Sequence, residues 1–133
     1  MRIGYVLAAL ALAGAATPSF AQDAEKGAKV FRLCMACHTA DAATNKVGPS
    51  LKGIFGRKAA TVEGFKYSPA MLAKGAEGVV WDEPTLTAYL PDPKKFVPGT
   101  KMAFGGVKKD PTRADLLAYL ATLSDAPKPF PAP

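Results

Sequence analysis

The chain is poor in the side chains that most often carry metal or redox chemistry. It contains two cysteines, one histidine and one tryptophan among 133 residues. It also lacks a long hydrophobic run, because the apolar stretch from Ile3 to Ala16 is shorter than the roughly 18 to 20 residues that span a bilayer. These absences argue against a membrane-spanning protein and leave one short segment where such chemistry could reside.

That segment is CMACH, Cys34 to His38, which holds both cysteines and the histidine. A disulfide between Cys34 and Cys37 would close a very small loop and constrain little of the unfolded chain. A zinc site would lack its fourth ligand, because the chain has no other Cys or His. A redox dithiol of the thioredoxin kind needs a preceding strand and a βαβ context, which the flanking sequence does not offer. The remaining interpretation is Cys-x-x-Cys-His, the rule for covalent haem attachment.

Residues 1–21 differ from the rest of the chain. A basic start at Arg2 is followed by the apolar run and then by small residues, a pattern typical of a secretory signal peptide cleaved after Ala21. We therefore expect export to the periplasm, a single domain over residues 22–124, and a Pro-rich flexible tail over residues 125–133.

Helical periodicity and capping signals predict an all-α domain, with several short helices and long loops wrapped around a cofactor. Gly27 lies four residues before Phe31 on one face and predicts a close helix crossing. Residues 39–66 are rich in Gly and polar side chains, so we expect mostly loop there, with room for a short helical turn around Ser50 to Phe55. The expected helices are residues 23–38, 68–75, 82–90 and 110–123.

The spacing in CMACH suits a porphyrin. Two thiols three residues apart on a helical turn, Cys34 and Cys37, can each add to one vinyl group. The adjacent His38 then lies over the ring centre, where its imidazole can bind iron.

With no second histidine, a methionine is the expected sixth ligand. Met1 is lost with the signal peptide, and Met35 is too close to the attachment site to reach the opposite face. Met102 lies in the loop VPGTKMAF, whereas Met71 lies in a helical segment and fits ordinary packing. We therefore predict Met102 as the ligand and Met71 as a core residue.

A neutral thioether favours ferrous iron and raises the reduction potential. Two protein ligands would leave no open position for oxygen or peroxide, which indicates electron transfer rather than catalysis. Two alternatives remain. One is a c-type haem enzyme of the peroxidase kind, or a gas sensor, with a labile sixth ligand; the other is a haem-free exported domain with a disulfide.

The chain resembles the class I c-type cytochromes, both mitochondrial cytochrome c and the bacterial c2-type carriers. The likeness extends from about Asp23 to Leu123. It rests on the segments CMACH, KVGPSLKGIFGRKA, GFKYSPAM, VVWDEPTLTAYLPDPKKFVPGTKMAF and RADLLAYL. The resemblance implies a cytochrome c fold with one covalently attached haem c.

The resemblance also implies roles for individual residues. The carbonyl of Pro49 would accept a hydrogen bond from the ligating imidazole, fixing the ring and tuning its basicity. Gly27 and Phe31 would cross the last helix against Leu116 and Tyr119. The remaining implied haem contacts are Arg57, Tyr67 and Trp81 at the propionates, Tyr89 and Thr100 near the methionine sulfur, and Phe104 over the exposed haem edge.

Two features depart from the family pattern. Between Tyr67 and Trp81 the chain is about three residues longer than the mitochondrial form, which affects the loop near the propionates. Met71 stands where relatives often carry a polar Asn, so a second sulfur is expected near the pocket.

Lysines flank the predicted ligand loop and the haem motif. A basic ring around an exposed redox edge would steer the protein toward acidic docking surfaces and give weak, salt-sensitive complexes. The expected partners are membrane-bound redox complexes: a cytochrome bc1-type donor, and an oxidase or a photosynthetic reaction centre as acceptor. We expect a monomer that contacts the membrane surface transiently, and export argues against nucleic acid as a partner. The lysines concerned are Lys46, Lys52, Lys94, Lys95, Lys101, Lys108 and Lys109.

Overall fold

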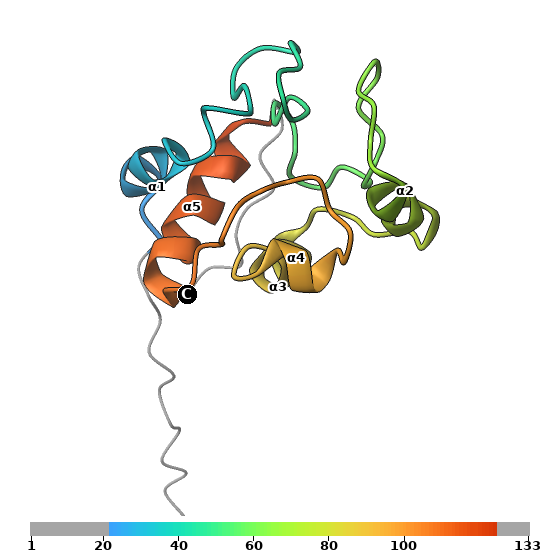
Figure 1. Ribbon diagram of the computed structural model, residues 1–133. Helices are drawn as coiled ribbons and strands as arrows, with labels where there is room; N and C mark the ends of the chain where they lie inside the picture. The colour runs from blue at the N-terminus through green and yellow to red at the C-terminus, as the bar shows by residue number, and fades with distance from the viewer. Residues whose placement is uncertain (1–21, 125–133) are drawn as a thin grey trace, which may run out of the picture.

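The structure, a computed structural model, describes residues 22–124, where short helices joined by long loops are the regular elements (Figure 1). One isolated bridge, between Lys58 and Val80, is the only extended pairing in this part of the chain. None of its helices is long and apolar enough to cross a membrane. The predicted all-α class is confirmed, whereas the predicted signal peptide and tail lie outside the described residues. The helices are α1 (Ala24–Phe31), α2 (Pro69–Ala76), α3 (Glu83–Tyr89), α4 (Pro93–Phe96) and α5 (Asp110–Thr122).

Local capping chemistry explains where most helices begin. The Asp23 side chain accepts hydrogen bonds from two backbone N–H groups in the first turn of α1. Ser68 caps α2 through Met71 N, and Asp82 caps α3 through Thr85 N. These bonds satisfy N–H groups that have no partner within the helix, so the chain starts a helix at each of these residues.

The structure corrects three details of the sequence-based expectation. The first helix ends at Phe31 rather than running to His38, and the chain continues in tight turns such as Cys34 N to Phe31 O at 2.8 Å. The segment from Ser50 to Phe55 is not helical, because Gly53 has a φ of 68° that an α-helix cannot contain. Helix α4 was not expected, since a helix of one turn has no periodicity to detect.

Helices α1 and α5 cross in close contact (Figure 1). A Cβ atom at Gly27 would lie 2.6 Å from the carbonyl carbon of Asp115 and 2.8 Å from the Cβ of Tyr119. One turn further on, the rings of Phe31 and Tyr119 meet with their centroids 5.1 Å apart. The predicted crossing at Gly27 is confirmed, and it fixes the point from which the chain enters CMACH.

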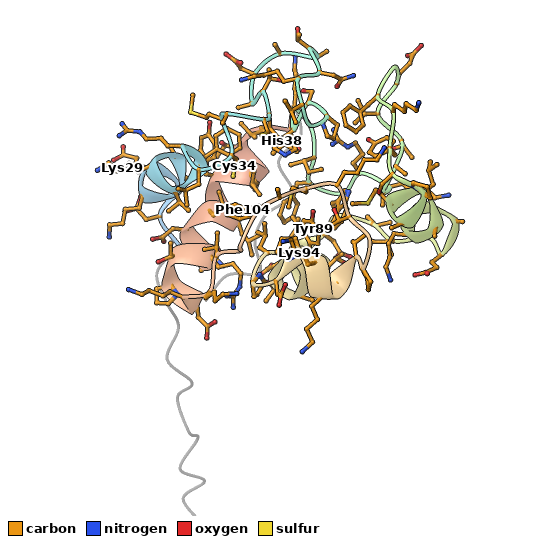
Figure 2. All side chains as sticks on the ribbon, viewed as in Figure 1. Lys29, Cys34, His38, Tyr89, Lys94 and Phe104 are labelled. Carbon is orange, nitrogen blue, oxygen red and sulfur yellow. The ribbon has the colours of Figure 1, made fainter. Side chains whose placement is uncertain are left out.

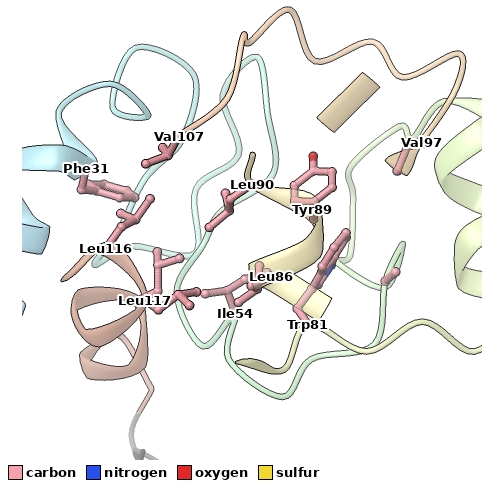
Figure 3. Close-up of a cluster of buried hydrophobic side chains, with 12 residues drawn as sticks. Phe31, Ile54, Trp81, Leu86, Tyr89, Leu90, Val97, Val107, Leu116 and Leu117 are labelled. Atoms are coloured by element: carbon pink, nitrogen blue, oxygen red, sulfur yellow. The ribbon is translucent and has the colours of Figure 1, made fainter. Parts of the chain in front are cut away.

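One buried hydrophobic cluster links this crossing to the middle of the chain (Figure 3). Phe31 and Leu116 lie at one end of the cluster, Leu86 lies near its middle, and Tyr89, Trp81 and Val97 lie toward the other end. Phe31 and Leu116 are 2 % and 1 % exposed, so each contributes roughly 2 kcal/mol through burial. The loops that carry the candidate site contribute residues to this cluster, among them Ile54 and Val97.

We predict that Gly27→Ala lowers the free energy of unfolding by about 3 kcal/mol, because the added methyl group must push α1 away from the backbone of α5. Gly105→Ala is the matched control, since a Cβ there has no heavy atom within 4 Å. Thermal and denaturant unfolding of both variants provides the measurement. Equal stabilities of the two variants would contradict the close crossing.

Candidate functional site

The CMACH segment forms a single compact turn directly after α1 (Figure 2). The carbonyl of Cys34 accepts from Cys37 N at 3.1 Å and from His38 N at 2.9 Å. These two bonds close the turn, so Cys34, Cys37 and His38 are fixed relative to one another. Both cysteines are half-buried free thiols. Burial, together with the neighbouring Cys37, raises the pKa of the Cys34 thiol to about 11.

His38 is held by the Pro49 carbonyl, as the resemblance implied, with Nδ1 2.7 Å from the carbonyl oxygen. A carbonyl oxygen can only accept, so Nδ1 carries the proton and Nε2 keeps a free lone pair, the tautomer that suits metal ligation. Burial lowers the pKa of His38, partly opposed by this hydrogen bond, and so favours the neutral imidazole.

Gly48 shapes the space for the imidazole, a role that the sequence analysis did not detect. A Cβ at this position would lie 2.7 Å from Nδ1 and 2.9 Å from Nε2 of His38. The same turn is tied back to the CMACH segment, because Gly48 N donates to the Cys37 carbonyl at 2.8 Å and Lys46 Nζ donates to the Met35 carbonyl at 2.6 Å. In the sequence Gly48 is simply a glycine before a proline, and nothing near it indicates contact with His38.

Arg57 and Trp81, two of the predicted propionate contacts, are brought together by paired backbone bonds. Trp81 N donates to the Arg57 carbonyl at 2.8 Å, and Gly56 N donates to the Trp81 carbonyl at 2.8 Å. The Arg57 guanidinium is half-buried and donates to the Ser50 carbonyl at 3.0 Å. Burial lowers the pKa of Arg57, and the nearby Tyr67 works in the opposite direction.

Tyr67 and Trp81 are held in place by different contacts. The Tyr67 hydroxyl accepts from Val62 N at 3.0 Å, so its own proton is available to donate. Trp81 is 6 % exposed and lies against Tyr89, with ring centroids 4.8 Å apart. Donors in such positions fit a cofactor that carries buried carboxylates.

The predicted sixth-ligand loop is held against α3. The Tyr89 hydroxyl donates to the sulfur of Met102 at 3.5 Å, and Thr100 Oγ1 accepts from Met102 N at 3.1 Å. Burial, with the Cys34 thiol as a second influence, raises the pKa of Tyr89 to about 12, so Tyr89 is a protonated donor at neutral pH. Met71 packs against the hydrophobic cluster as predicted, but Met102 and Phe104 do so too, so packing does not by itself distinguish the two methionines.

The residues present therefore fit a covalently attached haem. Within residues 22–124, no cluster of three or more His, Cys, Asp or Glu side chains could hold a bare metal ion. Cys34 and Cys37 would form the two thioethers. His38 offers a free Nε2 on one side, and Met102 offers a sulfur on the side where Tyr89 lies.

Comparison with known proteins agrees with this geometry. A sequence profile of the family described as "Cytochrome c" matches residues 24–124. The chain belongs to the cytochrome c family. Cytochrome c from Stellaria longipes is 53 % identical over 100 residues, covering 74 % of this chain and 90 % of that protein. Cytochrome c2 from Blastochloris viridis is 46 % identical over 110 residues, covering 82 % and 84 %. Cytochrome c2 iso-2 from Magnetospirillum molischianum is 50 % identical over 93 residues, covering 70 % and 93 %.

The family assignment confirms the resemblance to class I c-type cytochromes. It gives the protein one covalently attached haem c as cofactor and the general role of an electron carrier. The alternative of a haem-free domain with a disulfide is thereby set aside.

We predict that Gly48→Ala displaces the His38 imidazole and weakens its hydrogen bond to Pro49, because the ring and the new methyl group cannot share the same space. The free energy of unfolding should fall by about 2 kcal/mol. The fraction of purified protein that carries haem should also fall. Gly105→Ala again serves as the control. A Gly48→Ala protein with normal haem content and stability would contradict the close approach of Gly48 to the His38 ring.

Proposed function

We propose that this cytochrome is exported to the periplasm and carries single electrons between membrane-bound redox complexes. Cys34 and Cys37 would hold the haem covalently, and His38 and Met102 would bind its iron. The observation that supports this most directly is the pair of hydrogen bonds that position those two side chains, His38 to Pro49 and Tyr89 to Met102. When bound, the haem supplies a one-electron iron couple.

The chain's own residues restrict what that couple can do. Tyr89 donates to the Met102 sulfur and restrains its position, so Met102 would be available to fill the sixth position of the iron. Aromatic rings pack behind this contact, with Tyr89 and Phe96 centroids 5.7 Å apart and Trp81 and Phe96 centroids 6.5 Å apart. A rigid, apolar surround of this kind excludes water and limits reorganisation when the charge of the site changes.

The side of the site that would face the haem propionates is polar, because it holds hydrogen-bond donors for carboxylates. Arg57 has guanidinium donors beyond the two that bind the Ser50 and Lys52 carbonyls. The Tyr67 hydroxyl proton is also available to donate. These donors would neutralise and orient carboxylates that would otherwise be buried at high cost.

The lysines support docking to acidic partners unequally. All seven predicted lysines are exposed, and Lys94 lies on the short α4 (Figure 2). Two of them are also held by a hydrogen bond: Lys108 Nζ donates to the Pro91 carbonyl at 2.9 Å, and Lys46 Nζ donates to the Met35 carbonyl. We propose that the other five form the docking face for the donor and acceptor complexes: Lys52, Lys94, Lys95, Lys101 and Lys109.

Met102→Ala should remove the sixth ligand and give the protein an open iron position. We expect a large drop in reduction potential, loss of the low-spin spectrum and carbon monoxide binding to the reduced protein at neutral pH. Met71→Ala, which removes a sulfur of the same type from α2, should change none of these three properties. Unchanged spectra in Met102→Ala would favour the alternative of an enzyme or gas sensor with a labile sixth ligand.

Electron transfer to membranes that contain the partner complexes should slow as ionic strength rises. Salt screens the attraction between the exposed lysines and an acidic partner surface, and so slows association. Stopped-flow kinetics between low and high salt measure this dependence. Lys94→Gln should reduce the salt dependence, whereas Lys26→Gln should not, since Lys26 lies on α1 and already pairs with Asp23. Rates that are independent of salt would remove the case for electrostatic docking.

A further inference from the structure

Asn45 was not singled out by the sequence analysis, yet its side-chain amide bridges two loops. Its Oδ1 accepts from the Ser50 backbone N–H at 2.9 Å, and its Nδ2 donates to the Glu63 carbonyl at 3.2 Å. One partner can only donate and the other can only accept, so the orientation of the amide is fixed. Asn45 therefore joins the loop before Ser50 to the loop that contains Glu63 in a single geometry.

The N–H that Asn45 binds belongs to the same peptide group as the carbonyl that binds His38. The bond between Pro49 and Ser50 presents its C=O to His38 and its N–H to Asn45. A peptide group is planar, so holding its N–H also sets the direction of its C=O. Hydrogen bonds in a chain polarise one another, so an N–H that donates makes the carbonyl at the other end a stronger acceptor.

The Ser50 side of this peptide group is shielded from water. Ser50 is 3 % exposed, its hydroxyl donates to the Ala42 carbonyl, and its own carbonyl accepts from Arg57. With solvent excluded, the acceptor that Asn45 supplies is not easily replaced, and polarisation along the chain is only weakly screened.

We propose that Asn45 is a positioning residue for the iron's histidine: it orients and polarises the Pro49–Ser50 peptide group and so sets the strength of the hydrogen bond on His38. This inference rests on the proposed function, in which His38 Nε2 binds iron. A stronger bond at Nδ1 gives the imidazole more negative charge, which favours ferric over ferrous iron. Asn45 thus holds the reduction potential lower than it would be without the amide.

Asn45→Ala tests this in the haem-loaded protein. The proton on His38 Nδ1, followed by NMR in the reduced state, should shift upfield because its hydrogen bond weakens. The ferrous-to-ferric ratio at a fixed applied potential should rise, on the order of twofold. Thr39→Val is the matched structural control. It removes the hydroxyl that binds the Ala42 and Thr44 carbonyls in the same loop, but it leaves the Asn45 contact with Ser50 intact.

Asn45→Asp provides a second variant that separates polarisation from loop bridging. It loses the donor to Glu63, as Asn45→Ala does, but it keeps a charged acceptor for the Ser50 N–H. The Nδ1 proton should therefore shift downfield and the ferrous-to-ferric ratio should fall. Thr44→Asp adds the same charge at an exposed neighbour without touching Ser50, so the shift must exceed the one in that control.

The outcomes are distinguishable. If Asn45→Ala and Asn45→Asp lose stability but leave the Nδ1 proton and the potential where their controls leave them, Asn45 is a structural bridge only and the inference is wrong. If the His38 ring protons show no haem ring-current shift in the unmodified protein, His38 is not a ligand, and the proposed function and the inference that rests on it are both wrong.

Discussion

His38 donates from Nδ1 to the Pro49 carbonyl at 2.7 Å, and that bond decides which nitrogen of the only imidazole is free. Much of the surrounding loop structure serves the same contact. Gly48 leaves the ring room, and its N–H fastens the turn to the Cys37 carbonyl at 2.8 Å. On the far side of the same peptide group, Asn45 holds the Ser50 N–H. A long loop without helices is thereby made rigid where a haem ligand needs rigidity.

The rigidity of that loop would be of little use if the haem-attachment turn could move against it. The turn begins at the end of α1, and α1 is fixed to α5 by the Gly27 crossing, by the Phe31–Tyr119 ring contact and by Asp23 N donating to the Asp115 carboxylate at 2.9 Å. These contacts join the two ends of the described chain. The packing of the terminal helices therefore also sets the position of the attachment turn.

The features that could be predicted from sequence are those with local causes. Asp23, Ser68 and Asp82 cap helices because a side-chain oxygen two or three residues away binds a free N–H, and CMACH carries its own spacing rule. The end of α1 at Phe31 could not be predicted, because helical periodicity continues past it and only the turn at Cys34 interrupts it. The role of Asn45 could not be predicted either, since its partner at Glu63 is distant in sequence and is brought close only by the fold.

The two sides of the site are built on opposite principles. With His38 bound to iron as proposed, hydrogen bonds on its side would add negative charge to the imidazole and favour ferric iron. With Met102 as the other ligand, the Tyr89 hydroxyl, which donates to its sulfur, would draw electron density away from it and favour ferrous iron. Burial holds the pKa of Tyr89 at about 12, so this donor persists across physiological pH. In the proposed ligation, the potential would be a balance between the polar network behind His38 and the one buried hydroxyl beside Met102, and each could be changed by substitution without replacing a ligand.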